Sequence, residues 1–474
     1  MDVLNGIVSS INDVLWSYVL IIVLVGCGIA FTFGTKFVQL RLLPNMVHLL
    51  TEGVGKKTSG EQISSFQAFC VSTASRVGVG NIAGVAIAIV TGGPGAVFWM
   101  WVISFFGSAT GFVESTLAQI YKLPRGNRKF HGGPAYYILN GLHQPAIAKL
   151  FAILISVTFG MIYVSVQANT IAISTEKAFG IPPIFTALIL CGLTALVICG
   201  GMTRIAKFTE FLVPVMAGLY LLVAAIVIVM HIDQVPATLA LIVHDAFEPQ
   251  AAVGGGIGMA IITGLKRGLF SNEAGEGSVP NAAATADVTH PVKQGLVQAL
   301  GVYVDTWVVC TATASIILLS GQYVIGSDVT GIALAQQSLA SIFGPLAPSA
   351  VAIMIFLFAF SSVVGNYYYG EINIAFFEFK SPKVLNVFRA GVVTMVFFGC
   401  MAELSLVWNL ADLFMAFLCL TNLYAVIRLY PLASTALKDY VAQRKAGKDP
   451  VFDPSILKTQ DGIVAWEKPS DKEN

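Results

Sequence analysis

Charged residues are scarce in this sequence. Only 11% of its 474 residues are Asp, Glu, Lys or Arg, whereas 56% are hydrophobic and the mean hydropathy is +0.78. A soluble domain carries about 25% charged residues, so the composition excludes a soluble globular protein. We predict an all-α polytopic membrane protein, because a helix satisfies its own backbone hydrogen bonds within lipid.

Motifs for cofactor chemistry are also lacking. The seven cysteines are scattered through apolar runs, and none forms a Cys-x-x-Cys pair or a Cys/His cluster, which disfavours a metal centre or a disulfide framework. No G-x-x-x-x-G-K-[ST] loop for ATP is found. No acid, base and nucleophile set stands out, so we expect neither an enzyme nor a bound cofactor.

Apolar stretches of about 20 residues, the length that crosses a bilayer, occur eleven times. We therefore predict 11 transmembrane helices. Their approximate bounds are 14–34, 63–90, 95–121, 150–179, 183–200, 208–230, 251–268, 294–320, 347–371, 387–402 and 406–430.

The basic residues orient these spans. Of the 27 Lys and Arg residues, 25 fall in alternate connections or in the tail that begins at Arg428. Lys266 and Arg267 are assigned to one of these connections. Basic residues concentrate on the cytoplasmic side of a membrane. The N-terminus is therefore expected outside and the C-terminus inside the cell. The exceptions are Lys177, near a helix end, and Arg76, within a span.

Ten spans remain when the first is set aside, and two consecutive sets of five enter the membrane from opposite faces. The first span of each set is interrupted by glycines, at 78–81 and at 254–258. Paired interrupted helices indicate the midplane site of a transporter, although small residues also serve close helix packing. We expect an extra helix and connection (1–61), two five-helix repeats (62–250 and 251–431) and a loosely ordered cytoplasmic tail (432–474).

A broken helix exposes backbone groups that can bind a small zwitterion. The half-helix beyond the break presents N–H groups and a positive dipole end, which suit a carboxylate. Freed carbonyls suit an ammonium group or a hard cation. An amino acid carries both charges and fits such a site.

Three segments also resemble one known family. "VGVGNIAGVA" (77–86), "GGPGAVFWMWVISFFG" (92–107) and "GLFSNEAGEGSVPNAAATA" (268–286) resemble signatures of the alanine or glycine:cation symporters, also called sodium:alanine symporters. The resemblance extends over about residues 14–430. It implies a LeuT-type fold with a 5+5 inverted repeat preceded by one extra N-terminal helix. It further implies sodium-coupled uptake of alanine or glycine by alternating access, in a bacterial inner membrane, by a protein that functions as a monomer and binds no nucleic acid.

The resemblance also assigns site residues. Sodium, the coupling ion, is expected at Ala74, Val77, Ser361 and Ser362. Substrate is expected at Thr73, Ser75, Gly78, Gly80, Asn81, Gln167, Gly254, Gly255, Gly256, Ile257, Gly258 and Asn366. Asn366 stands where many relatives have tryptophan, and this polar replacement adds glutamine to the candidate substrates.

Several roles stay open at the level of sequence. Arg76, Glu114 and Asp305 are gate candidates, because intramembrane charges are functional by default. The alternatives for Arg76 are a substrate contact or a structural bond, and each carboxylate could instead be a structural partner of Arg76 or lie near the cytoplasmic interface. Residues 270–275 are interpreted as an inner-gate segment in a cytoplasmic connection. Proton coupling is the alternative to sodium coupling, and a channel is a less favoured reading.

Overall fold

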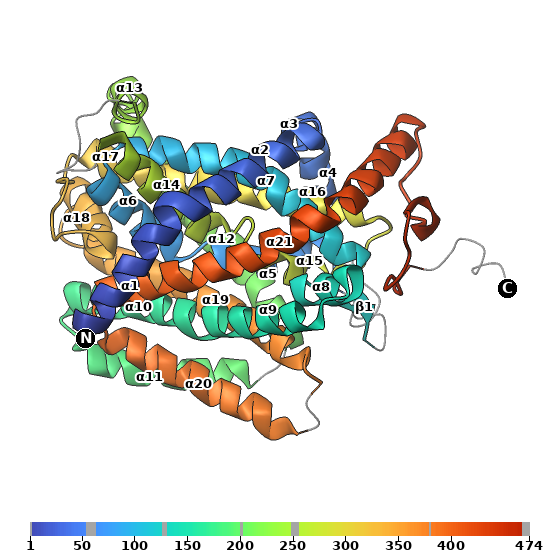
Figure 1. Ribbon diagram of the computed structural model, residues 1–474. Coiled ribbons are helices and arrows are strands. Elements are labelled where there is room, and N and C mark those ends of the chain that lie inside the picture. Colours follow the sequence, from blue (N-terminus) through green and yellow to red (C-terminus); the bar gives the residue numbers. More distant parts are fainter. Residues whose placement is uncertain are drawn as a thin grey trace.

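The protein is described here from a computed structural model, which covers residues 2–53, 63–125, 130–199, 202–247, 256–378 and 381–466. Its long helices run between two ends of the molecule (Figure 1). We call one end the N face; it carries the N-terminus and α18 (Gly331–Phe343). The opposite end, the C face, carries the hairpin of β1 (Leu123–Pro124) and β2 (Phe130–His131) together with residues 446–466.

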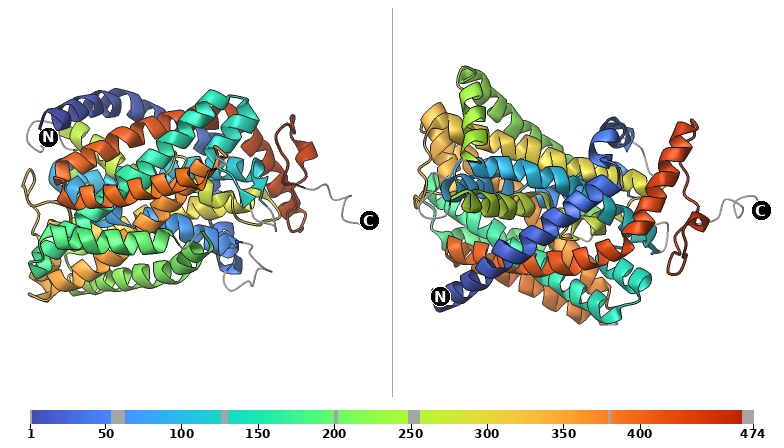
Figure 2. Two further views of the ribbon diagram at one scale, coloured as in Figure 1. Left: turned by 90° about the horizontal axis from the view of Figure 1, so that it is seen from below. Right: turned by 45° about the horizontal axis from the view of Figure 1, so that its top comes forward.

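The N-terminal helix lies against the last long helix. It consists of α1 (Asp2–Val14), η1 (Leu15–Leu20) and α2 (Ile21–Gly34), and two short helices, α3 (Val38–Arg41) and α4 (Leu43–Gly53), follow at the C face. Polar contacts fix it to α21 (Leu404–Lys445): the Asn12 amide donates to Asn409 O at 2.9 Å, and the Trp16 indole donates to Asp412 O at 3.2 Å. Figure 2 shows the two helices crossing.

The remaining helices follow in two series. The first comprises α5 (Ser65–Arg76), η2 (Gly80–Gly84), α6 (Val85–Gly92), α7 (Gly95–Ile120), α8 (Pro134–Leu142), α9 (Pro145–Val157), η3 (Thr158–Tyr163), α10 (Val164–Phe179), α11 (Pro183–Ile198), α12 (Met202–Met230) and α13 (Val235–Asp245). The second comprises α14 (Gly256–Asn272), α15 (Val279–Ala283), α16 (Pro291–Tyr303), η4 (Val304–Cys310), α17 (Thr311–Ser320), α18, α19 (Ala347–Ala375), α20 (Pro382–Met401), α21 and η5 (Pro454–Ile456).

Eight helices within the described ranges are long and apolar enough to cross a membrane, or nine if the bent pair α5–α6 counts as one span. The chain is thus an all-α membrane protein. The predicted number of eleven is not reached on these criteria, because α11 has only 16 residues and α14 only 17.

The first predicted interruption is present. A capping box between Ser64 and Gln67 starts α5. The helix ends at Arg76, the backbone of Val77 leaves the helical region (φ −79°, ψ 89°), and the helical axis turns by 50° before the span resumes at Gly80. Both halves are buried in the interior.

The second predicted interruption falls partly outside the described residues, and the chain has a break further along. Gly254 and Gly255 lie outside the described residues, but residues 256–258 form the first turn of α14, and Gly258 is exposed with open space around it. The chain instead leaves the helix after Asn272, where Glu273, Gly275 and Gly277 adopt positive φ values of 56°, 96° and 79°, and resumes at Val279. Glycine adopts such angles freely. The break therefore falls within "NEAGEGS", which is buried and not part of a cytoplasmic connection.

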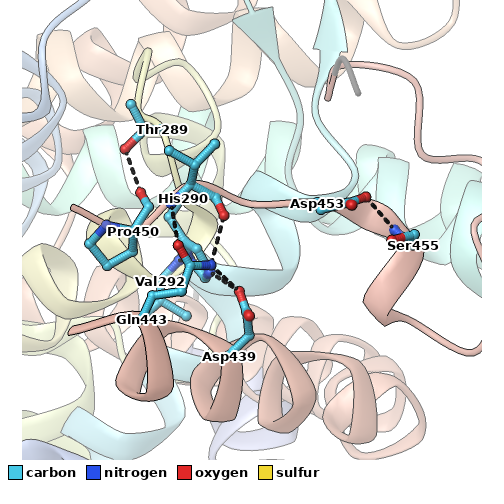
Figure 3. A network of polar contacts seen from close by, with 9 residues as sticks. Thr289, His290, Val292, Asp439, Gln443, Pro450, Asp453 and Ser455 are labelled. Carbon is cyan, nitrogen blue, oxygen red and sulfur yellow. Dashed lines mark hydrogen bonds and ion pairs between the residues drawn. The ribbon is translucent and has the colours of Figure 1, made fainter. Parts of the chain in front are cut away.

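The C-terminal region is folded as far as it is described, to residue 466. Helix α21 continues through Pro431 to Lys445, so the chain is not loosely ordered directly after residue 432 as predicted. Beyond it, the chain folds back on the start of α16: Thr289 Oγ1 donates to Pro450 O at 2.9 Å, and buried His290 lies 3.2 Å from the Asp439 carboxylate (Figure 3). Burial lowers the pKa of His290 to about 4, so the packed imidazole is neutral at pH 7.

Candidate functional site

Two side chains, one nearby in the chain and one from α10, hold the backbone at Gly78 and Val79. The Gly78 N–H donates to Asn81 Oδ1 at 2.9 Å, and the Val79 N–H donates to Gln167 Oε1 of α10 at 3.2 Å. These two N–H groups therefore point at neutral amide oxygens instead of helical carbonyls. Such oxygens can be exchanged for a stronger acceptor, such as a carboxylate.

Close packing explains the two glycines at this break. A Cβ on Gly78 would collide with the Ser362 hydroxyl and lie 3.2 Å from Gln167 Oε1. A Cβ on Gly80 would lie 2.9 Å from the Phe270 ring. The backbone is thus in direct contact with α19, α10 and α14, as expected of a site that brings peptide groups close to a ligand.

The two adjacent serines of α19 differ in their contacts. Ser362 Oγ lies 2.9 Å from Ala74 O in the last turn of α5 and 3.1 Å from Phe358 O of its own helix. Ser361 Oγ donates to Phe358 O at 2.8 Å and lies 3.6 Å from the Met216 sulfur. The structure thus brings Ala74 and Ser362 together and directs Ser361 toward α12. The N–H of Val77 donates to Thr73 O at 2.7 Å, and Thr73 Oγ1 has no hydrogen-bond partner among the described residues.

A second polar group connects α5 to the interruption after α14. Ser75 Oγ lies 2.6 Å from Glu273 Oε1 and 2.7 Å from Asn366 Oδ1. A hydroxyl carries one proton, so it donates to one of these acceptors at a time. Glu273 also accepts from Ser278 Oγ at 2.6 Å. Asn366 is only 1% exposed, and its Nδ2 has no partner in the described structure.

Asn81 connects the two interruptions. Its Nδ2 donates to Asp305 Oδ1 at 2.7 Å and to Ser271 Oγ at 2.9 Å, and Ser271 Oγ lies 2.6 Å from Asp305 Oδ2. Because Asn81 also accepts from Gly78, one side chain fixes the break in α5–α6 to α14 and η4. Asp305, a predicted gate candidate, is the hydrogen-bond partner of Asn81.

The other predicted gate residues are also buried. Arg76 is 2% exposed; its Nη1 lies 3.4 Å from Gln298 O, and its Nε and Nη2 have no hydrogen-bond partner among the described residues. Glu114 accepts from the Gly275 N–H at 3.2 Å and from Asn422 Nδ2 at 2.8 Å, and so anchors the second interruption to α7 and α21.

A cavity of about 490 Å³ approaches this site from the N face. Its lining includes an ion pair that the sequence reasoning missed: the Arg267 guanidinium donates to both oxygens of Asp412, and both side chains are about 95% buried. Arg267 and Lys266 therefore lie within α14, not in the cytoplasmic connection to which their charge had assigned them. Asp412 lies within the predicted span 406–430, but nothing local in the sequence identified its partner.

Aromatic rings separate this cavity from the open backbone. The Arg267 guanidinium lies 4.5 Å from the Trp408 ring, whose centroid is 4.7 Å from that of Phe270. Phe270 in turn covers Gly80. Trp408 and Phe270 thus lie between the Arg267–Asp412 ion pair and the backbone of Gly80.

Comparisons with known proteins identify the family of the chain. Residues 1–454 match the profile described as the sodium:alanine symporter family. The chain is 53% identical over 465 residues to the "Probable sodium/glutamine symporter GlnT" of Bacillus subtilis (98% of this chain, 96% of that protein). It is 48% identical to the "Amino-acid carrier protein AlsT" of Bacillus subtilis (98% of each chain). It is 37% identical to the "Sodium/alanine symporter AgcS" of Methanococcus maripaludis (93% of this chain, 98% of that protein).

A solved structure supports the expected fold. The crystal structure of MhsT in complex with L-phenylalanine matches with a TM-score of 0.53 and 13% identity, covering 86% of this chain and 94% of that one. The likeness confirms the LeuT-type fold, and the family confirms a transporter rather than an enzyme. By its family profile and by relatives that match almost its whole length, this chain belongs to the sodium:alanine symporter family.

Proposed function

We propose that the protein carries a small neutral amino acid together with sodium, by alternating access around the interruption between α5 and α6. One observation carries the proposal: at residues 77 and 78 the backbone leaves the helix in the buried interior, and the N–H groups of Gly78 and Val79 are held by exchangeable amide oxygens of Asn81 and Gln167. Unwound backbone within a membrane protein is tolerated where it lines a cavity or a ligand site.

The chemistry of each substrate group follows from the geometry. The carboxylate takes the N–H groups of Gly78, Val79 and Gly80, at the positive end of α6, with Asn81 and Gln167 turning to accommodate it. The ammonium group faces the C-terminal carbonyls of α14, near Ser271, where a helix end is electronegative. The break after Asn272 thus takes the role first assigned to residues 254–258.

Sodium binds between α5 and α19 in this proposal. Ala74 O and Ser362 Oγ already lie 2.9 Å apart, and the carbonyl of Val77 lies at the same helix end. Carbonyl and hydroxyl oxygens suit a hard cation. Because Ser361 faces Met216, we assign the hydroxyl ligand to Ser362 alone.

Asn366 sets the choice of side chain. Its buried Nδ2 lacks an acceptor in the described structure, and leaving such a donor unpaired costs about 1–3 kcal/mol. The amide oxygen of a glutamine side chain would satisfy it, whereas the methyl group of alanine would not. We therefore propose that glutamine is transported alongside alanine and glycine.

Sodium coupling suffices energetically. One net charge moving through 100 mV contributes about 2.3 kcal/mol, and a tenfold sodium gradient adds about 1.4 kcal/mol. The sum, about 3.7 kcal/mol, supports roughly 500-fold accumulation. A proton-linked mode is the second candidate, since a relative that is 43% identical is named "Putative sodium/proton-dependent alanine carrier protein YrbD", and Glu114 and Asp305 are buried carboxyl groups in this chain.

We also propose eleven spans, with α11 and the interrupted α14–α15 element completing the set. The N face lies outside the cell, the C face lies inside, and a single chain suffices for transport. The two inverted repeats occupy residues 62–250 and 251–431.

The decisive experiment is uptake into proteoliposomes. Radiolabelled alanine, glycine and glutamine are supplied with sodium or with choline, with and without a proton ionophore. We expect accumulation that requires sodium and resists the ionophore. Uptake that is unchanged in choline but abolished by the ionophore would show that protons, not sodium, are the coupling ion. Uptake that responds to neither change would refute coupled transport.

A further inference from the structure

A second cavity, of about 270 Å³, lies at the C face between the end of α2 and the last turns of α21. Four of its ten lining residues are basic, and none is acidic. The four are Lys36, Arg41, Lys438 and Lys445. The pocket is remote from the transport site and is not explained by it.

Two parts of the chain build the pocket. On α21, Ser434, Lys438 and Lys445 follow at spacings of four and seven residues, which places them on one helix face. Opposite them, Lys36 follows α2 directly with a left-handed backbone (φ 56°), and Arg41 donates to Thr35 O at 3.3 Å. Tertiary packing thus concentrates basic residues that are some 400 positions apart.

These four cations are not neutralised by the protein. Within the part of the chain that the structure describes, none forms an ion pair with a carboxylate, whereas nearby Lys293 lies 2.6 Å from Asp449. All four side chains are exposed to the surroundings. Like charges around one cavity repel one another, and a bound anion relieves that repulsion.

The pocket also lies at the edge of the bilayer. Gly34, in its lining, ends the apolar span Asn5–Gly34, and the neighbouring side chain of Phe33 is 63% exposed. Helix α21 has 42 residues, about 63 Å at 1.5 Å per residue, roughly twice the hydrocarbon thickness. Its last turns therefore project beyond the bilayer core, so charged groups stand directly above apolar, lipid-facing ones.

We propose that this pocket binds the phosphate of an anionic phospholipid in the leaflet at the C face. Basic pockets between membrane helices are suited to lipid headgroups. The volume equals about nine waters at 30 Å³ each, which leaves room for a phosphodiester and its hydration. The exposed apolar side chains below, such as Phe33, offer a path for the acyl chains.

The test measures lipid binding by the full chain in neutral detergent, by native mass spectrometry during titration with phosphatidylglycerol or phosphatidylcholine. Each basic residue at an anionic lipid surface contributes about fivefold in affinity. We expect Lys438→Gln/Lys445→Gln to weaken phosphatidylglycerol binding about 25-fold. Phosphatidylcholine binding should change less than threefold.

A matched control is Lys149→Gln/Lys383→Gln, which removes the same charge from exposed sites at the starts of α9 and α20. An equal loss in this control would show general surface attraction and overturn the pocket. Inorganic phosphate that displaced phosphatidylglycerol at equal concentration would overturn the lipid as the ligand. Lys36→Asn provides an independent variant if the double variant misfolds, because asparagine tolerates the left-handed backbone at this position. We expect it to weaken phosphatidylglycerol binding about fivefold.

Discussion

Replacing Ser362 with alanine tests the sodium site most directly. The substitution removes the hydroxyl that lies 2.9 Å from Ala74 O and leaves the fold of α19 otherwise unchanged. A hydrogen bond or ligand contact to a charged group contributes about 1.5–3 kcal/mol. The sodium concentration for half-maximal uptake should therefore rise about 10- to 150-fold.

The neighbouring serine is the matched control. Ser361 is equally buried, but its hydroxyl donates to Phe358 O and faces Met216. Ser361→Ala should shift half-maximal sodium less than threefold, and Ser362→Thr, which keeps a hydroxyl, should recover most of the affinity. Sodium titrations of alanine uptake into proteoliposomes provide the measurement. Equal shifts for the two alanine variants, or none for Ser362→Ala, would refute the assignment of sodium to Ser362.

Three further predictions concern other parts of the structure. Gly78→Ala forces a methyl group against the Ser362 hydroxyl and should reduce uptake more than tenfold. Gly258→Ala adds a methyl group that faces open space and should leave uptake unchanged. Loss of uptake in both variants would show that residues 254–258 belong to the transport site. Asp412→Asn leaves the buried Arg267 charge without its partner and should destabilise the protein by about 3 kcal/mol in thermal unfolding. The double variant Arg267→Gln/Asp412→Asn should recover part of this loss. A loss in the double variant equal to the sum of the two single losses would contradict the pairing. The pKa of His290 in the folded protein is about 4, below its ordinary value of 6.5. The unfolded chain therefore takes up a proton first as the pH falls below about 6.5, and the free energy of unfolding should decrease by about 2 kcal/mol at pH 5. Amides of residues 449–457 should lose protection from hydrogen exchange at pH 5, after correction for intrinsic rates, and His290→Gln should remove this pH dependence.

The sequence predicted the class of the molecule and one of its two helix interruptions. Hydropathy is a local property, so the membrane fold and most of the spans could be read from composition along the chain. The first break was also visible, because Gly78 and Gly80 interrupt an apolar run beside Arg76. The break after Asn272 was not predicted: the glycines at 254–258 form a conspicuous cluster, while those at 275 and 277 lie among polar residues and resemble a loop.

What the sequence by itself determined was which segments lie in lipid and where one helix opens, because both follow from local hydrophobicity and glycine's lack of a side chain. Only the tertiary structure decided which carbonyl Ser362 meets, that Arg267 pairs with Asp412, and that Asn81 joins two interruptions. Successive residues of a helix point about 100° apart, so a Ser-Ser pair does not reveal which serine faces the site. A buried charge, likewise, is stable only where the fold supplies its partner, and for Arg267 that partner lies 145 residues away.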